Sequence, residues 1–261
     1  MYDRKNTLKE KAKNHVEKCY SLYGDAIKHA IDNTYIRDCS ASNISIPDVM
    51  KEKYSSGIQI IIEDADTVSS LYHHHDDEEK TAILNFASYK FPGGGFLEGA
   101  RAQEECLCHE SILYNVLQYY EMGYYDLNRK NTNKSLYRNK CLYSEDILFL
   151  KGDKQLYANV ISCAAPNKYA AKKYSNVSES VASDVLKSRI KFVLDTAAVY
   201  DNRTLILGAY GCGVFGNNAT EVASIFKYYL TGEYNHAFKK VVFAIPAGEN
   251  LSKFIEVFNA G

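Results

Sequence analysis

Short apolar runs alternate with segments of helical periodicity along most of the chain, and this alternation limits the possible folds more than any other feature. Runs rich in β-branched residues have the length of buried strands, and we expect strands over 58–62, 81–87, 147–150, 157–164, 204–207 and 241–245. Apolar residues spaced three and four apart predict helices over 7–31, 65–72, 101–122, 177–200, 218–230 and 250–258. Strands that alternate with helices favour an α/β fold with a largely parallel sheet covered on both faces.

The chain is long enough to build one sizeable core, since it has 261 residues of which 46% are hydrophobic. We find no internal repeat and no linker, and therefore expect a single domain over 1–261, in which 1–57 is an N-terminal helical extension packed on the rest. The region around Pro47 is expected to be irregular. The polar, tyrosine-rich segment 123–145 is expected to be a loop with short helical pieces.

Charge and cysteine content restrict the partners and the compartment. The formal net charge is −1, from 31 basic and 32 acidic residues, so no overall field draws the chain to nucleic acid or to an anionic membrane. The seven cysteines form no CxxC pair, which favours reduced thiols. No segment approaches the ~18–20 apolar residues of a membrane span, and the N-terminus lacks an apolar leader run. We expect a cytoplasmic monomer without a membrane or sequence-specific nucleic-acid partner. Non-classical export into a host is the alternative.

A glycine triplet is followed closely by two adjacent carboxylates. Gly93, Gly94 and Gly95 come after the strand expected at 81–87, and Gln103, Glu104 and Glu105 open the next helix. Glycines let a ligand touch bare main chain, and ligands in open α/β sheets bind at the carboxyl ends of strands. Adjacent carboxylates on a helix point roughly 100° apart, so one can hold a hydroxyl while the other transfers a proton. That division of roles suits cleavage of a glycosidic bond.

A second glycine-rich loop, 208–217, follows another expected strand and opens a helix. Backbone N–H groups and the positive end of a helix form a cradle for phosphate. Gly211, Gly213 and Gly216 also match the dinucleotide pattern GxGxxG, but too few residues follow them for the rest of that fold. The chain contains no GxxxxGK[ST]. We expect a diphosphate site without a redox cofactor, and a tight turn is the alternative.

Two groups of histidines invite other interpretations. His73–His75 precede the acidic run 76–79, and imidazole and carboxylate are metal ligands. Because consecutive side chains point in different directions, a solvated loop is the favoured interpretation and we predict no metal. His109 lies one turn beyond Glu105 and could be a second acid or base. A structural histidine is again favoured.

The stretch 92–105, PGGGFLEGARAQEE, resembles the signature of the microbial-type poly(ADP-ribose) glycohydrolases, a macrodomain subgroup in which GGG is followed by six to eight residues and then QEE. Here the spacer 96–102 has seven residues. The match extends to NFAS before the triplet and to GAYGCGVFGN in the second loop. The resemblance implies a three-layer α/β/α macrodomain-like fold with a mixed, mostly parallel sheet. It implies neither a metal nor a redox cofactor.

The resemblance also implies roles for individual residues. Glu105 would be the catalytic acid/base at the ribose–ribose bond of poly(ADP-ribose), Glu104 would hold the ribose hydroxyls, and Gln103 would support the arrangement. The other substrate-binding residues would be Asn85, Gly93, Gly94, Gly95, Gly211, Cys212, Gly213, Val214 and Phe215. The adenine end would lie toward Glu63, Asp64, Ile245 and Pro246. The partner would be ADP-ribose polymer or an ADP-ribosylated protein. Alternatives are a hydrolase of mono-ADP-ribosylated protein or nucleic acid, and a non-catalytic ADP-ribose-binding module.

Overall fold

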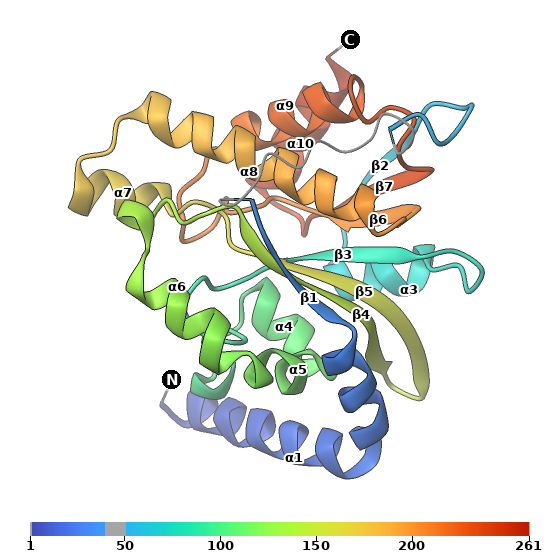
Figure 1. Cartoon of the computed structure of the whole chain (residues 1–261), viewed down its shortest axis with the longest axis vertical. Helices are drawn as coiled ribbons and strands as arrows, with labels where there is room; N and C mark the ends of the chain where they lie inside the picture. Colours follow the sequence, from blue (N-terminus) through green and yellow to red (C-terminus); the bar gives the residue numbers. More distant parts are fainter. Residues whose placement is uncertain (1, 40–50, 261) are drawn as a thin grey trace.

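A mixed sheet forms the centre of the molecule (Figure 1). The computed structural model describes residues 2–39 and 51–260, and within these ranges the sheet has seven strands in the order β1-β4-β5-β3-β6-β7-β2. The pairs β3–β5, β3–β6, β6–β7 and β2–β7 are parallel, whereas β4–β5 and β1–β4 are antiparallel. The strands are β1 Thr34–Asp38, β2 Gln59–Glu63, β3 Thr81–Phe86, β4 Lys140–Lys151, β5 Lys154–Cys163, β6 Thr204–Leu207 and β7 Lys240–Ala244.

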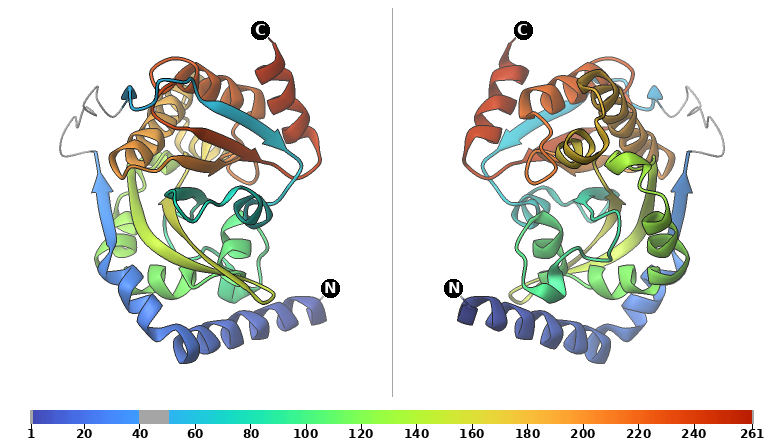
Figure 2. Two further views of the ribbon diagram at one scale, coloured as in Figure 1. Left: turned by 90° about the vertical axis from the view of Figure 1, so that its right-hand side faces the viewer. Right: turned by 90° about the vertical axis from the view of Figure 1, so that its left-hand side faces the viewer.

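Helices cover both faces of this sheet (Figure 2). Helices α8, α9 and α10 bury their apolar sides in one core, and α1, α3 and α5 contribute to the other. The helices are α1 Tyr2–Asp32, α3 Thr67–His74, α4 Gln103–His109, α5 Leu113–Tyr119, α6 Asp126–Lys130, α7 Lys168–Ser175, α8 Glu179–Val199, α9 Ala219–Leu230 and α10 Glu249–Asn259. The three-layer α/β/α arrangement expected from the alternating pattern is therefore present.

The central strand β3 shows why the inner strands of this sheet are visible in the sequence as apolar runs. Ala82 and Leu84 face the core beneath α8 and α9, whereas Ile83 faces the opposite core. Successive side chains of a strand point to opposite faces, so a strand covered on both sides is apolar at successive positions, as 82–84 are here.

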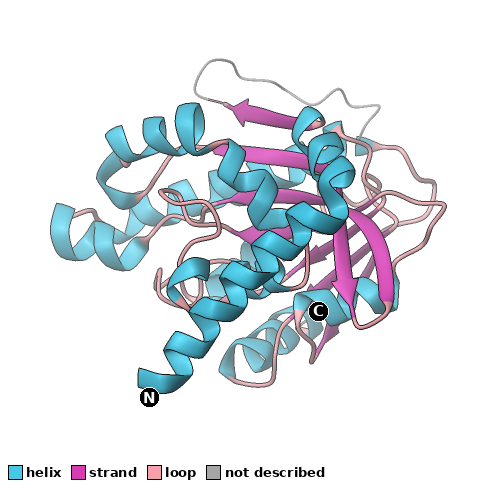
Figure 3. Cartoon of the chain, turned by 90° about the horizontal axis from the view of Figure 1, so that it is seen from below, coloured by secondary structure: helices cyan, strands magenta, loops and turns pink. Residues whose placement is uncertain are grey.

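Helix α1 packs on the outside of its layer (Figure 3). Ala12 and Cys19 are fully buried in the core below the sheet. The side chain of Asn115 on α5 donates to the carbonyl of Val16 at 3.1 Å, and the Tyr120 hydroxyl donates to the carbonyl of Ile31 at 2.9 Å. The N-terminal segment is thus attached to the body by buried apolar surface and by hydrogen bonds to backbone carbonyls.

The expectation of irregular structure after the first helix is partly wrong. Residues 34–38 form the edge strand β1, in antiparallel register with residues 140–144 of β4. The strand is only half-buried, and its sequence, TYIRD, lacks the apolar run that marks the inner strands. The segment around Pro47 lies outside the described residues.

The helix expected over 101–122 is two helices, because long-range pairing interrupts it. Ser111 forms an isolated antiparallel bridge with Phe149, and the Ile112 N–H donates to the carbonyl of Leu148 at 3.1 Å.

The expectation of a loop over 123–145 also fails at its end, where β4 begins at residue 140 and continues through a bulge between Ser144 and Ile147. Helix α7 was not expected at all. None of the helices in the described ranges is long and apolar enough to cross a bilayer.

Candidate active site

The two glycine loops meet at one edge of the sheet. Strands β3 and β6 are parallel neighbours, with Ile83 opposite Ile206, so the loops at their carboxyl ends are adjacent. A cleft of about 450 Å³ lies there, and a smaller one of about 120 Å³ adjoins it. Both are lined by Phe86, Ala102, Gln103, Ala209 and Gly213, so they form one groove, which we call the sheet-edge groove.

The glycine triplet packs directly against the two carboxylates. Gly93 and Gly94 have positive φ angles of 65° and 58°, a conformation that glycine adopts without steric cost. A Cβ atom on Gly94 would lie 2.7 Å from Glu105 Oε1 and 2.9 Å from Glu104 Oε2. A side chain at this position would therefore displace both acids.

Glu105 is held by the backbone at the start of α4. Its Oε1 accepts a hydrogen bond from the Gly95 N–H at 2.9 Å, and its Oε2 accepts one from the Ala102 N–H at 2.8 Å. The second bond reaches back from the third helical residue to the N-cap, as in half of a capping box. The carboxylate is thereby fixed between the glycine triplet and the helix.

Glu104 is buried deeper and has a shifted proton affinity. It is 3% exposed, and it accepts hydrogen bonds from Asn85 Nδ2 at 3.2 Å and from the Ser88 N–H at 2.7 Å. Burial raises the pKa of Glu104 to about 8; the two hydrogen bonds oppose this rise, and the negative charge of Glu105 adds to it. A carboxyl group with this pKa carries a proton at neutral pH.

Two amide side chains fix the segment that carries the acids. Gln103 Oε1 accepts from the Phe86 N–H at 2.8 Å, and Gln103 Nε2 donates to the Leu84 carbonyl at 2.9 Å and to Thr67 Oγ1 at 3.2 Å. Asn85 is fully buried and also donates to Ser162 Oγ at 3.1 Å. Gln103 therefore lines the groove while it ties α4 to β3 and α3. Asn85 lies behind Glu104, and neither carboxylate is part of the lining itself.

The second glycine loop is closed by one asparagine. Asn217 Nδ2 donates to the carbonyls of Pro166 at 2.9 Å and Gly211 at 3.1 Å, and Gly211 has a φ of 72°. The side chain of Val214 is 86% exposed. No hydrogen bond found among residues 2–39 and 51–260 uses the N–H of Gly213, Val214 or Phe215 as its donor, so these groups can bind an anion.

Two other positions in this loop have side chains turned toward the protein. The Cys212 thiol lies 3.8 Å from the Tyr210 carbonyl, and burial raises the pKa of Cys212 to about 12. The Phe215 ring packs edge-on against Tyr137, with centroids 6.0 Å apart, and Tyr137 stacks on Tyr89 at 4.3 Å. Tyr137 comes from the segment for which the sequence predicted a loop. The only sign in the sequence was the high tyrosine content of this segment, and it did not indicate which tyrosine would contact Phe215.

At the other end of the groove, the acidic pair after β2 separates. The Asp64 carboxylate accepts from the Ala247 N–H at 2.7 Å and so shapes the loop after β7, whose Ile245 and Pro246 line the groove. The Glu63 carboxylate instead contacts α3. Asp66 and Asn250 also line the groove. Sequence reasoning missed both because each lies in an ordinary polar segment.

His109 does not extend the acid/base pair. Its ring packs edge-on against Phe96, with centroids 4.6 Å apart, and it is not among the groove-lining residues. Burial lowers the pKa of His109. His109 Nε2 is buried without a hydrogen-bond partner among the described residues, so packing alone holds the ring, and a structural role for this histidine stays a prediction.

Residues 6–152, more than half of the chain, match the family model for the microbial-type PARG catalytic domain. The chain belongs to this family. The resemblance stated from the GGG-x7-QEE stretch is therefore confirmed. Comparison with curated protein sequences gives no match.

Solved structures of PARG, poly(ADP-ribose) glycohydrolase, resemble the chain over most of its length. PARG from Deinococcus radiodurans in complex with ADP-ribose is 28% identical with a TM-score of 0.81, covering 90% of this chain and 97% of that one. PARG from Thermomonospora curvata bound to the inhibitor ADP-HPD is 27% identical, also with a TM-score of 0.81, covering 98% and 99%. The predicted macrodomain-like α/β fold is thus confirmed as the fold of this PARG family member.

Proposed function

We propose that this chain hydrolyses the O-glycosidic ribose–ribose bond of poly(ADP-ribose) and releases ADP-ribose, with Glu105 as the general acid/base. The family is one of glycohydrolases, and its solved members include one in complex with ADP-ribose. The observation that carries the proposal is the position of Glu105. Its carboxylate is held by the N–H groups of Gly95 and Ala102, beside the sheet-edge groove.

The residues in and beside the groove divide the steps of this reaction among them. Glu105 protonates the oxygen of the leaving ribose and then accepts a proton from the water that attacks the anomeric carbon. Glu104 hydrogen-bonds the ribose hydroxyls, and Gly94 lets the sugar approach both acids. Gln103 and Asn85 position the acids through the bonds described above.

The second loop serves the other half of the ligand. The N–H groups of Gly213, Val214 and Phe215 bind the diphosphate, and Gly211 and Cys212 shape the turn that presents them. The Phe215 ring packs beside the ribose next to the scissile bond, supported by Tyr137. The adenosine extends past Thr67 toward Ile245 and Pro246, where the larger part of the groove lies.

The Glu105→Gln variant tests the assignment because it keeps the shape of the side chain and removes its proton transfer. We expect ADP-ribose affinity, measured by calorimetry, to stay within about tenfold of the native value. Release of ADP-ribose from the polymer should fall by roughly 10²-fold to 10⁴-fold. Glu98→Gln, at an exposed carboxylate of the same segment, is the matched control. Near-native turnover by Glu105→Gln would overturn the role of this residue.

Substrate choice is tested by incubating the native chain with poly(ADP-ribose) and, separately, with proteins that carry single ADP-ribose units on different residues. We expect release from the polymer. Release from the mono-modified proteins alone would replace the polymer in this proposal, and binding without release from any substrate would make the chain an ADP-ribose-binding module.

We further propose that the described segments belong to one catalytic domain and that the chain is a cytoplasmic monomer. Strand β1 joins the N-terminal segment to the sheet, which supports one domain, and all seven cysteines are unpaired, which suits a reducing compartment. Light scattering should give a mass near 29.5 kDa, and a dimer mass would refute the monomer.

A further inference from the structure

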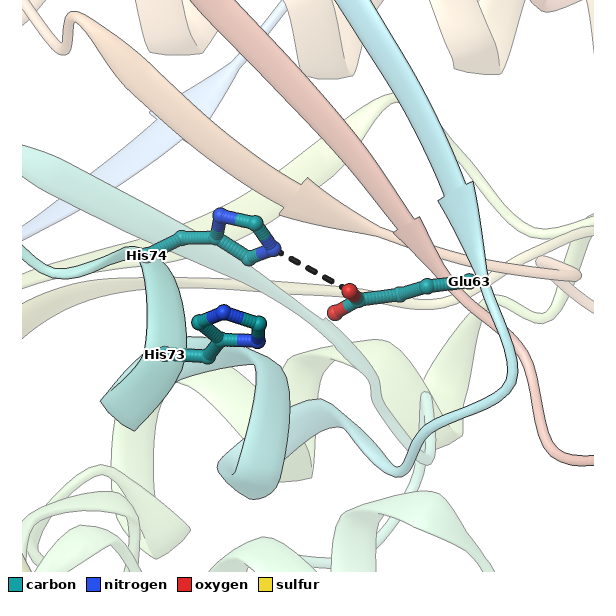
Figure 4. Close-up of side chains that lie close together, drawn as sticks. All are labelled: Glu63, His73 and His74. Carbon is teal, nitrogen blue, oxygen red and sulfur yellow. Dashed lines mark hydrogen bonds and ion pairs between the residues drawn. The ribbon is translucent and has the colours of Figure 1, made fainter.

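The histidine run at the end of α3 is not used by the proposed reaction. His73 and His74 are the last two residues of this helix, and Glu63 ends the neighbouring strand β2. The structure brings these three side chains together (Figure 4). One ligand atom from each lies within 4.8 Å of the other two. The acids of 76–79, which follow the histidines in sequence, are not part of this cluster.

We propose that Glu63, His73 and His74 bind one zinc ion, or a transition-metal ion of similar preference, through two imidazole nitrogens and one carboxylate oxygen. Such ligands suit zinc, which is usually four-coordinate, and water would complete the shell. The site is separate from the sheet-edge groove and does not depend on the proposed glycohydrolase reaction.

The distance between His74 and Glu63 fits this coordination. His74 Nε2 lies 3.2 Å from Glu63 Oε2, and two ligands of a tetrahedral zinc ion with bonds of about 2.0–2.1 Å are about 3.3 Å apart. The rings of His73 and His74 stack with centroids 4.6 Å apart and planes inclined by 17°. A nitrogen of each ring faces the same carboxylate (Figure 4). His73 is exposed, so its ring can turn to complete the shell.

A buried serine orients the carboxylate. Ser70 is fully buried, one turn before His74, and its hydroxyl donates to Glu63 Oε1. Groups that hydrogen-bond a ligand in this way fix its orientation toward a metal.

His75 provides an internal comparison. Its Nε2 pairs with Asp77 Oδ1 at 3.1 Å, and it caps the end of α3 without joining the cluster. Substitution of His75 thus removes a histidine of the same run and leaves the three proposed ligands in place.

The site joins β2 to the helix that borders the groove. Thr67, the first residue of α3, accepts the hydrogen bond from Gln103, while His73 and His74 end the same helix. A metal ion held by Glu63 as well as by the two histidines would bind the folded chain more tightly than the unfolded one, and so would raise the unfolding temperature.

Calorimetric titration with zinc chloride tests the proposal on the full chain, freed of any affinity tag and treated with chelator. We expect one zinc ion per chain. His74→Ala and Glu63→Gln should each weaken binding by more than the about 10-fold to 100-fold that loss of an outer partner costs. Ser70→Ala should fall within that range, and His75→Ala should bind as the native chain does.

The unfolding temperature gives a second readout, and circular dichroism checks that each variant is folded. Zinc should raise this temperature for the native chain and for His75→Ala, and leave it unchanged for His74→Ala. The proposal is refuted if the native chain binds no stoichiometric zinc. It is equally refuted if His74→Ala and Glu63→Gln bind zinc as the native chain does, because the metal would then be on other groups such as the cysteines.

Discussion

Raising the pH from 5 to 8 should destabilise the folded chain through one carboxyl group, Glu104. Burial raises its pKa from the ordinary value of 4.5 to about 8. Below about pH 4.5 the group is protonated in both the folded and the unfolded chain. Between the two pKa values only the folded chain keeps the proton, so the free energy of unfolding falls as the pH rises. Above pH 8 the group is ionised in both states and the loss is complete.

The size of this effect follows from the shift. One pKa unit corresponds to about 1.4 kcal/mol, so the interval from pH 5 to pH 8 is worth up to roughly 4 kcal/mol. A typical domain has only about 5–15 kcal/mol of stability in total. This single group should therefore dominate the pH dependence of the free energy of unfolding between pH 5 and pH 8.

The assay is urea unfolding of the native chain and of Glu104→Gln at several pH values from 5 to 9. Glutamine does not ionise, and its amide group opposes one of the N–H donors at Ser88 and Asn85, which adds a cost that is constant over this range. The variant should therefore gain up to roughly 4 kcal/mol relative to the native chain between pH 5 and pH 8.

A matched control is Glu98→Gln, since Glu98 is exposed and the Lys9 side chain lowers its pKa. This variant should follow the native profile at every pH. If Glu104→Gln and the native chain gave parallel profiles from pH 5 to pH 8, burial would not raise the pKa of Glu104 and the reasoning would be refuted.

Three substitutions test other parts of the structure. Gly94→Val should abolish ADP-ribose binding in calorimetry because the valine side chain meets both carboxylates. Gly152→Val should bind ADP-ribose normally, because Gly152 also has a positive φ but has open space around it. Undiminished affinity of Gly94→Val would contradict the proposed contact. Asn217→Ala removes the two bonds that close the second loop and should raise the Kd for ADP-ribose about tenfold; an unchanged Kd would show that the loop keeps its shape without them. Arg189→Met leaves the carbonyls of 136 and 164 without their buried donor and should cost about 3 kcal/mol in urea unfolding. Lys187→Met, on the exposed side of the same helix, loses a contact between its ammonium group and the Tyr228 ring and should cost at most about 1 kcal/mol. Equal costs would refute the role of the buried guanidinium.

The sequence alone determined the features that depend on local pattern. Inner strands such as β3 and β6 are buried on both faces, so they must be apolar at successive positions, and that requirement is visible as a run of letters. The GGG-x7-QEE stretch is also local, because the glycines and the acids they contact are separated by fewer than a dozen residues. The family, the fold class and the two facing glycine loops could be predicted for this reason.

Tertiary structure decided the features that depend on contacts between distant segments. Strand β1 exists because residues 34–38 pair with β4, and the break between α4 and α5 exists because Ser111 pairs with Phe149. The position of Tyr137 beside Phe215 has the same origin.

The properties of single groups follow the same division. The pKa of Glu104 is set mainly by the layers of the fold that exclude water from it, and its amino-acid neighbours give no sign of this. Glu63 and His74 meet because α3 folds back so that its last turn lies beside the end of β2, and no motif in the sequence indicates this contact. From the sequence, the acids that follow the histidines were the candidate metal ligands. The folded chain brings an earlier glutamate to His73 and His74, because ligand geometry depends on distances in space.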